Sequence, residues 1–112
     1  MLFRSVAQAV RNLIHNGLDA SGDMGRVSVE PQLLPEHLQI SVVDSGQGMS
    51  QEVLGRASDP FFTTKEPGRG IGLGLFLTRN VISKLGGRLE FRSALGQGTE
   101  AVVTIPLGKQ KT

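Results

Sequence analysis

The chain lacks three features that define whole classes of protein. It has no cysteine, which excludes a disulfide framework and a thiolate metal site. It has no tryptophan or tyrosine and a net charge of only +2, so a base-stacking surface and electrostatic binding of nucleic acid are poorly supported. No apolar run approaches the roughly 20 residues of a membrane span, and no signal-peptide pattern opens the sequence. We therefore expect a cytoplasmic segment with no nucleic-acid partner and no direct membrane contact.

Length and composition indicate one globular domain. With 112 residues, 38% hydrophobic and 20% charged, the chain is long enough for one core and too short for two. We take residues 1–112 as a single domain. Ten of its 15 glycines gather at residues 46–48, 68–74, 86–87 and 96–98, rather than spreading as they do in a linker. Clustered glycine indicates several places where main-chain geometry matters.

The stretch at 59–75 is the strongest functional signal in the chain. Gly70, Gly72 and Gly74 alternate with aliphatic residues and lead into an apolar pattern with helical spacing. Glycine lets the main chain approach a bulky anion, and a helix start offers free N–H groups and a positive dipole end. A phosphate site is one interpretation of this pattern, and a flexible loop before a helix is the other.

A pair of amides occupies one turn of an earlier helix. Apolar residues at spacings of three and four predict a helix over 3–20, with Asn12 and Asn16 one turn apart on one face. Asn is unfavourable inside a helix. The pair is therefore either solvent-facing or capping, or it turns an amide oxygen toward a hard cation such as Mg²⁺. Gly17 indicates a close approach of another main chain or a ligand at the same turn.

Two predicted strands, at 26–34 and 38–44, lead to Asp44. Alternating apolar residues predict both strands, and Pro31 and Pro35 place their connection at a sheet edge or in a turn. Asp44 with Gly46 and Gly48 is typical of a turn. A carboxylate beside bare main chain is equally suited to accept a hydrogen bond from the exocyclic amine of a base, so both interpretations stay open.

The rest of the chain predicts two helices and a hairpin. A short helix begins at Ser50 with an N-cap pattern, and a longer helix follows the 59–75 stretch and ends before Gly86 and Gly87. Residues 88–93 and 100–107 are predicted strands joined through the glycine turn at 96–98. The near-continuous apolar run at 101–105 predicts burial on both sides of the last strand.

Five motifs stand in a fixed order along the chain. They are Asn-Leu-Ile-His-Asn at 12–16, Asp-Ser-Gly-Gln-Gly at 44–48, Asp-Pro-Phe-Phe at 59–62, Gly-Ile-Gly-Leu-Gly-Leu at 70–75 and Gly-Gln-Gly-Thr at 96–99. They resemble, in that order, the N box, first glycine box, phenylalanine box and second and third glycine boxes of one domain. That domain is the ATP-binding catalytic domain of bacterial sensor histidine kinases, in the ATPase group that also holds gyrase, Hsp90 and MutL.

The resemblance implies an α+β fold. The expected architecture is a two-layer α/β sandwich of the Bergerat type, in which a mixed sheet carries helices on one face and ATP lies on the helical layer under a flexible lid. Family domains usually have a strand or two before the N-box helix. The resemblance therefore also implies a catalytic fragment that is truncated at its N-terminus and lacks the dimerisation and phosphoacceptor segment.

The resemblance implies a role for each matching residue. Asn16 would bind the Mg²⁺ that bridges the phosphates and Asn12 would assist, so both are expected to be catalytic. Asp44 would receive the adenine amino group, Gly46 and Gly48 would line the base pocket, and Thr99 would support Asp44, usually through water. The other expected nucleotide contacts are Phe62, Lys65, Arg69, Gly70, Ile71, Gly72, Leu73, Gly74 and Leu75.

The resemblance also implies phosphoryl transfer rather than hydrolysis. Gyrase-like members carry a water-activating glutamate at the position of Asn12. The γ-phosphate would go to a histidine on the dimerisation helices of a parent kinase, with the receiver domain of a response regulator as a further partner. Gly17 and Asp19 depart from the residues commonest at their positions. A non-catalytic nucleotide-binding regulatory module and an anti-sigma-type serine kinase are the alternatives.

Overall fold

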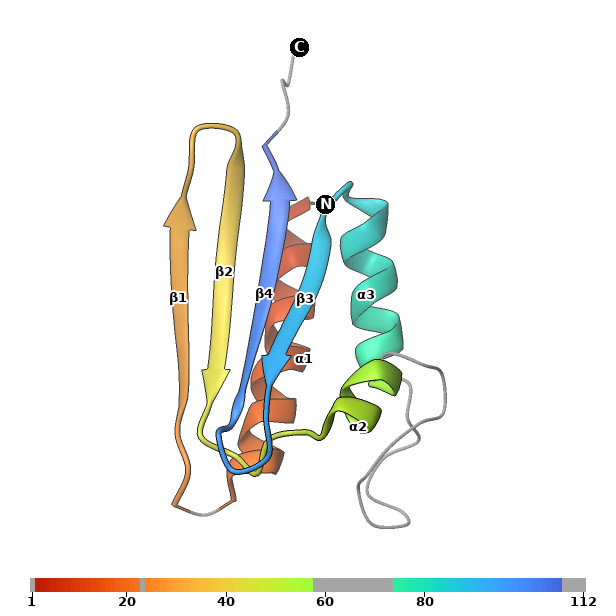
Figure 1. Ribbon diagram of the computed structural model, residues 1–112. Helices are drawn as coiled ribbons and strands as arrows, with labels where there is room; N and C mark the ends of the chain where they lie inside the picture. Colours follow the sequence, from red (N-terminus) through yellow and green to blue (C-terminus); the bar gives the residue numbers. More distant parts are fainter. Residues whose placement is uncertain (1, 23, 58–73, 108–112) are drawn as a thin grey trace.

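The computed structural model of the protein describes residues 2–22, 24–57 and 74–107, with no account of the side chains at 2, 3 and 74. One four-stranded sheet carries helices on a single face (Figure 1). The elements, in chain order, are α1 (Leu2–Ser21), β1 (Val27–Leu33), β2 (His37–Asp44), α2 (Gln51–Arg56), α3 (Gly74–Lys84), β3 (Arg88–Ser93) and β4 (Thr99–Pro106). This is the predicted α+β arrangement with helices on one side.

The sheet has the strand order β1-β2-β4-β3, and each neighbouring pair is antiparallel. The expected mixed sheet is therefore wrong for the strands that the structure describes. The physical reason is the connectivity. β2 and β3 run in the same direction and are joined through the helices, but β4 returns by a hairpin and inserts between them. β2 and β3 therefore point the same way, but each is hydrogen-bonded to the antiparallel β4 and not to the other.

The hydrophobic core lies between the sheet and the paired helices α1 and α3. Because α1 repeats its apolar residues every three or four positions, one stripe of the helix faces the sheet. One exception is Leu18, which has the spacing of that stripe but is 49% exposed. At this turn the helix instead turns Gly17 toward β1 and β2. The buried core consists of Ala9, Leu13, Ile40, Val42, Ile82, Leu89, Ala101, Val103 and Ile105.

β4 is buried on both of its sides, as its apolar run predicted. Val103 faces the helices and is fully buried, while its neighbour Val102 faces the other side of the sheet and is only 6% exposed. A strand alternates its side chains between two faces. Val102 lies between Ser41 of β2 and Glu90 of β3 in the cross-strand register, so flanking strands shield it. Because β4 lies between two other strands, its sequence does not alternate regularly between apolar and polar residues.

The ends of the helices follow from local sequence. Ser50 Oγ accepts a hydrogen bond from Val53 N at 3.2 Å, which is the predicted N-cap of α2. At the end of α3, Gly87 N donates to Ile82 O and Gly86 N to Ser83 O, both at 2.9 Å. With Gly86 at φ +80°, these two bonds form a Schellman cap. Within 2–22, 24–57 and 74–107, none of the helices combines the length and apolar character that crossing a bilayer requires.

β1 is an edge strand, and Pro31 lies in its middle. Leu34 N donates to His37 O at 2.8 Å and closes the β1–β2 hairpin. Because hydrogen-bonded and non-hydrogen-bonded pairs alternate along antiparallel strands, the Pro31–Ile40 pair is a non-hydrogen-bonded one. The missing N–H of Pro31 therefore faces the open edge and costs the sheet no hydrogen bond. This agrees with the edge position predicted from the prolines.

Candidate functional site

A row of four side chains crosses the sheet at the end where β2 and β3 finish and β4 begins. Val27, Asp44, Thr99 and Ser93 are direct cross-strand partners in that order. They share the helical face, because they continue the alternation of core residues on their strands. The last turns of α1 and the first turn of α3 lie at this same end of the molecule (Figure 1). We call these four residues the polar-end row.

Asp44 is oriented by its own loop. Its Oδ1 accepts a hydrogen bond from Gly46 N at 2.8 Å, which is a local Asx-type turn. The turn interpretation of this aspartate is thus confirmed, and it does not exclude the ligand interpretation, since a carboxylate has about four acceptor positions. A Cβ placed on Gly17 would stand 3.2 Å from Asp44 Cβ and 3.0 Å from Val27 Cγ2. Gly17 therefore lets α1 lie directly on the polar-end row.

Glycines of the two loops at this end are required by close main-chain approach. A Cβ on Gly46 would stand 2.7 Å from the carbonyl oxygen of Ala20 in α1. A Cβ on Gly48 would collide with the carbonyl of Ala94, and one on Gly98 with the carbonyl of Asp44; both glycines also have φ near +76°. The loop at 45–50 is therefore enclosed by α1 on one side and by the β3–β4 turn on the other. Motifs that are far apart in sequence are in direct contact here.

Ser93 links these two loops by hydrogen bonds. Its Oγ accepts from Met49 N at 2.8 Å, donates to Gly98 O at 2.9 Å and lies 2.8 Å from Thr99 Oγ1. A fourth bond, from Gly96 N to Gln47 O at 2.7 Å, holds the same two loops together. Our reading of the sequence missed Ser93. The signal was present, because Ser93 follows the inward-facing Leu89 and Phe91 at steps of two and precedes a glycine motif.

The paired amides of α1 face α3. Asn12 Nδ2 donates to Thr78 Oγ1 at 3.3 Å, and Thr78 is only 1% exposed. Asn12 is half-buried, so for this residue the solvent-facing and capping alternatives are wrong. Asn16 is also half-buried and lies one turn closer to the polar-end row, directly before Gly17. Thr78 is a second residue that our reading of the sequence passed over.

Part of the expected phosphate site can be placed. Gly74 is the first residue of α3, and Leu75 is partly buried and packs against the hydrophobic core. The phenylalanine box and Phe62, Lys65, Arg69, Gly70, Ile71, Gly72 and Leu73 lie outside the described residues. For these positions the roles stay predictions.

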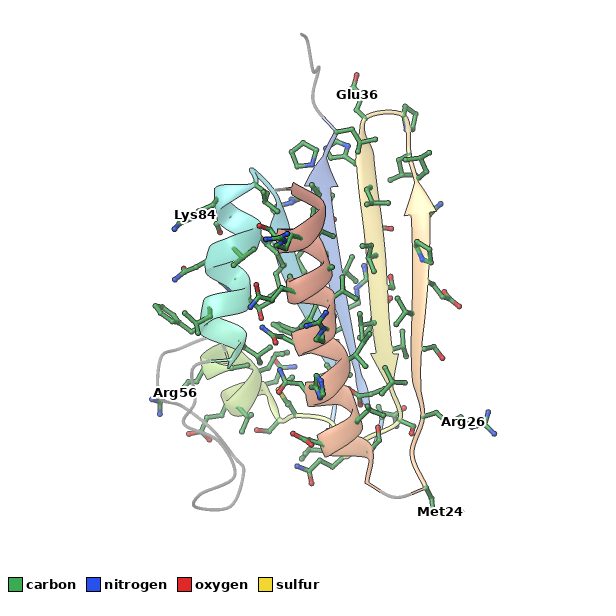
Figure 2. All side chains as sticks on the ribbon, turned by 180° about the vertical axis from the view of Figure 1, so that it is seen from behind. Met24, Arg26, Glu36, Arg56 and Lys84 are labelled. Atoms are coloured by element: carbon green, nitrogen blue, oxygen red, sulfur yellow. The ribbon has the colours of Figure 1, made fainter. Side chains whose placement is uncertain are left out.

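Charged side chains lie at both ends of the sheet. Figure 2 shows Arg26 and Arg56 toward the end that carries Asp44, and Glu36 and Lys84 toward the opposite end. Arg26 is fixed to the loop after Asp44, because its N–H donates to Ser45 Oγ at 2.9 Å and its carbonyl accepts from Ser45 N at 3.1 Å. The end with Asp44 therefore carries charged side chains of both signs.

The described residues also define which metal this end can hold. Among residues 2–22, 24–57 and 74–107, no three His, Cys, Asp or Glu side chains lie close enough together to form a metal cluster. The oxygen donors that α1 brings toward this end include the amides of Asn12 and Asn16. A neutral amide oxygen fits Mg²⁺, which commonly takes one or two protein ligands and completes its shell with phosphate oxygens and water. The donor set therefore fits a magnesium ion that arrives with a phosphate ligand.

Comparison with known proteins shows which family the chain resembles. The model of the histidine kinase-, DNA gyrase B- and HSP90-like ATPase family matches residues 3–109. Sensor protein DegM of Bacillus sp. (strain B21-2) is 34% identical over 105 residues, which is 94% of this chain and 28% of DegM. Sporulation kinase D of Bacillus subtilis is 34% identical over 102 residues, 91% of this chain and 20% of that kinase. The chain thus spans less than a third of either relative.

Solved structures agree with the sequence comparison. The mycobacterial sensor histidine kinase MprB superposes with a TM-score of 0.81 at 28% identity, over 92% of this chain and 72% of that one. A nucleotide-free form of the catalytic domain of histidine kinase ThkA gives 0.80 at 28% identity, over 92% and 67% of the two chains. The chain therefore belongs to the histidine kinase-, DNA gyrase B- and HSP90-like ATPase family, as a domain of the sensor histidine kinase type.

Proposed function

We propose that residues 1–112 form one catalytic domain that binds Mg·ATP at the polar end of the sheet and donates the γ-phosphate to a histidine on a separate dimerisation domain. The observation that carries this proposal is the meeting of three distant motifs at one place. Asp44, the glycine loop after it and the turn before Thr99 are in contact, under the helix turn that carries Asn16. The chain belongs to a family of ATPases, so ATP is the class of ligand that we propose for this place.

Asp44 is the proposed recognition group for the base. Its Oδ1 already accepts from Gly46 N, and the carboxylate retains acceptor positions for the exocyclic amine of adenine. Gly46 and Gly48 let α1 and the β3–β4 turn close around the loop that follows this carboxylate, because a Cβ at either position would collide with main chain. A hydrogen bond to an ionised carboxylate is roughly twice as strong as one between neutral groups. Asp44 is thus the residue on which affinity for adenine depends most.

The amides of α1 are the proposed link to the phosphates. Asn12 uses its Nδ2 toward Thr78, which leaves its Oδ1 pointing in a different direction within the amide plane, and Asn16 lies one turn closer to Asp44. When bound, Mg²⁺ would neutralise phosphate charge, which lowers the barrier to phosphoryl transfer. The N-terminus of α3 at Gly74 would add main-chain N–H groups for the phosphate oxygens. Together these groups position a triphosphate, and positioning is the main task in this reaction.

The nucleophile is proposed to come from a partner. An amide at Asn12 cannot take a proton from water, so the described part of this site favours storage of ATP over its hydrolysis. The proposed acceptor is a histidine on the dimerisation helices of the parent kinase, and the receiver domain of a response regulator is the proposed partner after that. We propose a cytoplasmic setting for this domain, whatever the location of the parent protein.

A nucleotide titration tests the binding step. Calorimetry with a non-hydrolysable ATP analogue and Mg²⁺ should show binding to the wild-type chain. Asp44→Asn should weaken it about 10- to 100-fold, because a hydrogen bond to a charged group is lost. Glu36→Gln is the matched control, since it makes the same carboxyl-to-amide change at the opposite end of the sheet (Figure 2) and should leave affinity unchanged. Equal affinity of Asp44→Asn and wild type would contradict the proposal.

A transfer assay tests the chemical step. The dimerisation segment of a related sensor kinase, supplied in trans with γ-labelled ATP, should become labelled on histidine. Histidine phosphate is acid-labile, so the label should disappear in acid. Acid-stable label would instead indicate the serine kinase alternative. Binding of ATP without any label on the segment would indicate a regulatory module.

A further inference from the structure

The Ser93 hydroxyl is at the centre of the contacts that hold the polar-end row. It is half-buried and lies within hydrogen-bond distance of three groups from two loops: Met49 N, Gly98 O and Thr99 Oγ1. Two of these three partners can take part in a hydrogen bond in only one way, either as donor or as acceptor. The amide of Met49 can only donate, and the carbonyl of Gly98 can only accept.

These roles determine the direction of the third bond. A serine hydroxyl has one hydrogen and two acceptor positions. Its hydrogen goes to Gly98 O, and Met49 N–H takes one acceptor position. The contact with Thr99 at 2.8 Å is then satisfied only if Thr99 donates its own hydrogen to Ser93. The reverse direction would leave Ser93 and Gly98 O as two acceptors 2.9 Å apart without a hydrogen between them.

Thr99 is thereby left with acceptor positions alone for any ligand. Asp44 lies directly opposite Thr99 in the β2–β4 register, on the same face of the sheet. A side chain and its direct cross-strand partner have Cβ atoms about 5 Å apart. A ligand at this end of the sheet therefore meets two acceptors side by side, the carboxylate of Asp44 and the hydroxyl oxygen of Thr99.

We propose that Ser93 is a positioning residue which makes Thr99 a hydrogen-bond acceptor, so that the Asp44–Thr99 pair selects a purine with an exocyclic amine against one with a carbonyl. The inference rests on the proposed function and deepens it. An amine, or a water bound with it, supplies hydrogens to both acceptors. A carbonyl oxygen in the same place supplies none and leaves buried polar groups unpaired, which is the basis of strong discrimination between such analogues.

The test compares ATP with ITP, whose base carries a carbonyl where adenine has its amine. In the full chain with Mg²⁺, wild type should bind ATP more tightly than ITP. In Ser93→Ala the Thr99 hydroxyl can turn and donate to the carbonyl, so the ATP-to-ITP affinity ratio should fall about fivefold, the order of one hydrogen bond. Ser28→Ala, an exposed serine on β1, is the matched control and should keep the wild-type ratio.

The outcomes separate this inference from the proposed function. If wild type binds ATP and Ser93→Ala weakens both nucleotides equally, or changes neither, Ser93 is structural and the inference is wrong. If wild type binds neither nucleotide, the proposed function fails together with it. Ser93→Thr retains the hydroxyl and should restore the wild-type ratio, which a general loss of loop structure would not allow.

A measurement without ligand checks the same arrangement. The amide of Met49 should exchange its hydrogen slowly in wild type and in Ser93→Thr, and quickly in Ser93→Ala, because the Ser93 oxygen is its acceptor. The amide of Gly96 is the internal reference, since it donates to Gln47 O and not to Ser93. Fast exchange of Met49 in wild type would overturn the inference even if Ser93→Ala does not fold.

Discussion

The two ends of the sheet differ in the groups that their long-range contacts bring together. At the end with Glu36, a short turn joins β1 to β2, a Schellman cap ends α3, and the carbonyl of Glu36 accepts a hydrogen bond from Leu107 N at 2.9 Å. At the end with Asp44, Ser93 binds Met49 across 44 positions of sequence and Gly98 lies against Asp44. These contacts at the first end join main-chain groups, whereas those at the second also bring polar side chains of distant segments together.

This difference explains where a site can form. A contact between two main-chain groups, such as the one from Leu107 N to Glu36 O, uses both of its partners and presents no side chain to a ligand. Close approach of distant loops instead produces carboxylate, hydroxyl and bare main chain in one small region. The polar end is therefore the proposed functional end, and it should also be the more sensitive to small changes. The predictions below test that difference, beginning with the largest expected effect.

Gly98→Ala should destabilise the fold far more than Gly96→Ala. Both glycines have φ +77°, so a left-handed penalty of about 1–2 kcal/mol applies to each. A Cβ on Gly98 also collides with the carbonyl of Asp44, whereas one on Gly96 meets nothing within 4 Å. In Gly98→Ala, but not in Gly96→Ala, overpacking should lower the free energy of unfolding by about 1–3 kcal/mol more. Urea unfolding measures both; equal losses would show that close approach at this end is unimportant.

Thr78→Val should have an intermediate effect. The change keeps the shape of a 1%-exposed side chain but removes the acceptor for Asn12 Nδ2, which leaves a half-buried amide without that bond. We expect a loss of about 1–2 kcal/mol in the free energy of unfolding. Thr104→Val makes the same change on β4, on the sheet face away from the helices, and should stay within about 0.5 kcal/mol. A comparable loss in both variants would contradict a special role for the α1–α3 contact.

Pro31→Val should change the stability of the isolated chain least. Its main-chain nitrogen faces the open edge of β1, so no bond to β2 is gained or lost and the effect should stay within about 0.5 kcal/mol. The new N–H points outward and adds a free donor to the open edge of β1, where a second chain could pair with it. Self-association, measured by sedimentation, should therefore increase. Gln32→Val on the same strand is the control, because its N–H points toward β2. Equal association of both variants would indicate apolar contact rather than strand pairing.

Much of the fold could be predicted from sequence, because the signals were local. The apolar stripe of α1, the cap at Ser50 and the stop at Gly86 each depend on a few neighbouring residues, and the structure confirms all three. The mixed sheet was the error. Strand pairing depends on which hairpin inserts beside which strand, and no local residue pattern records the insertion of β4 between β2 and β3.

The site was predictable in part for the same reason. Asp44 was indicated by its type and the glycines after it, Asn12 by its spacing from Asn16, and Thr99 by the resemblance to the family. The structure places Asp44 and Thr99 directly opposite each other on neighbouring strands. Thr78 and Ser93 did not, because a threonine in a helix and a serine at a strand end have many ordinary uses. Their importance depends on partners 66 and 44 positions away.

By itself the sequence determined the helices and strands, the one-sided sheet and the family of ATPases to which the chain belongs, because periodicity, caps and motif order are properties of neighbouring residues. Only the tertiary structure decided that Gly17 lies on Asp44, that the two glycine loops touch, and that the hydroxyl of Ser93 directs that of Thr99. Hydrogen bonds and close contacts have a range of a few ångströms. Which distant residues come within that range is decided by the packing of the whole domain.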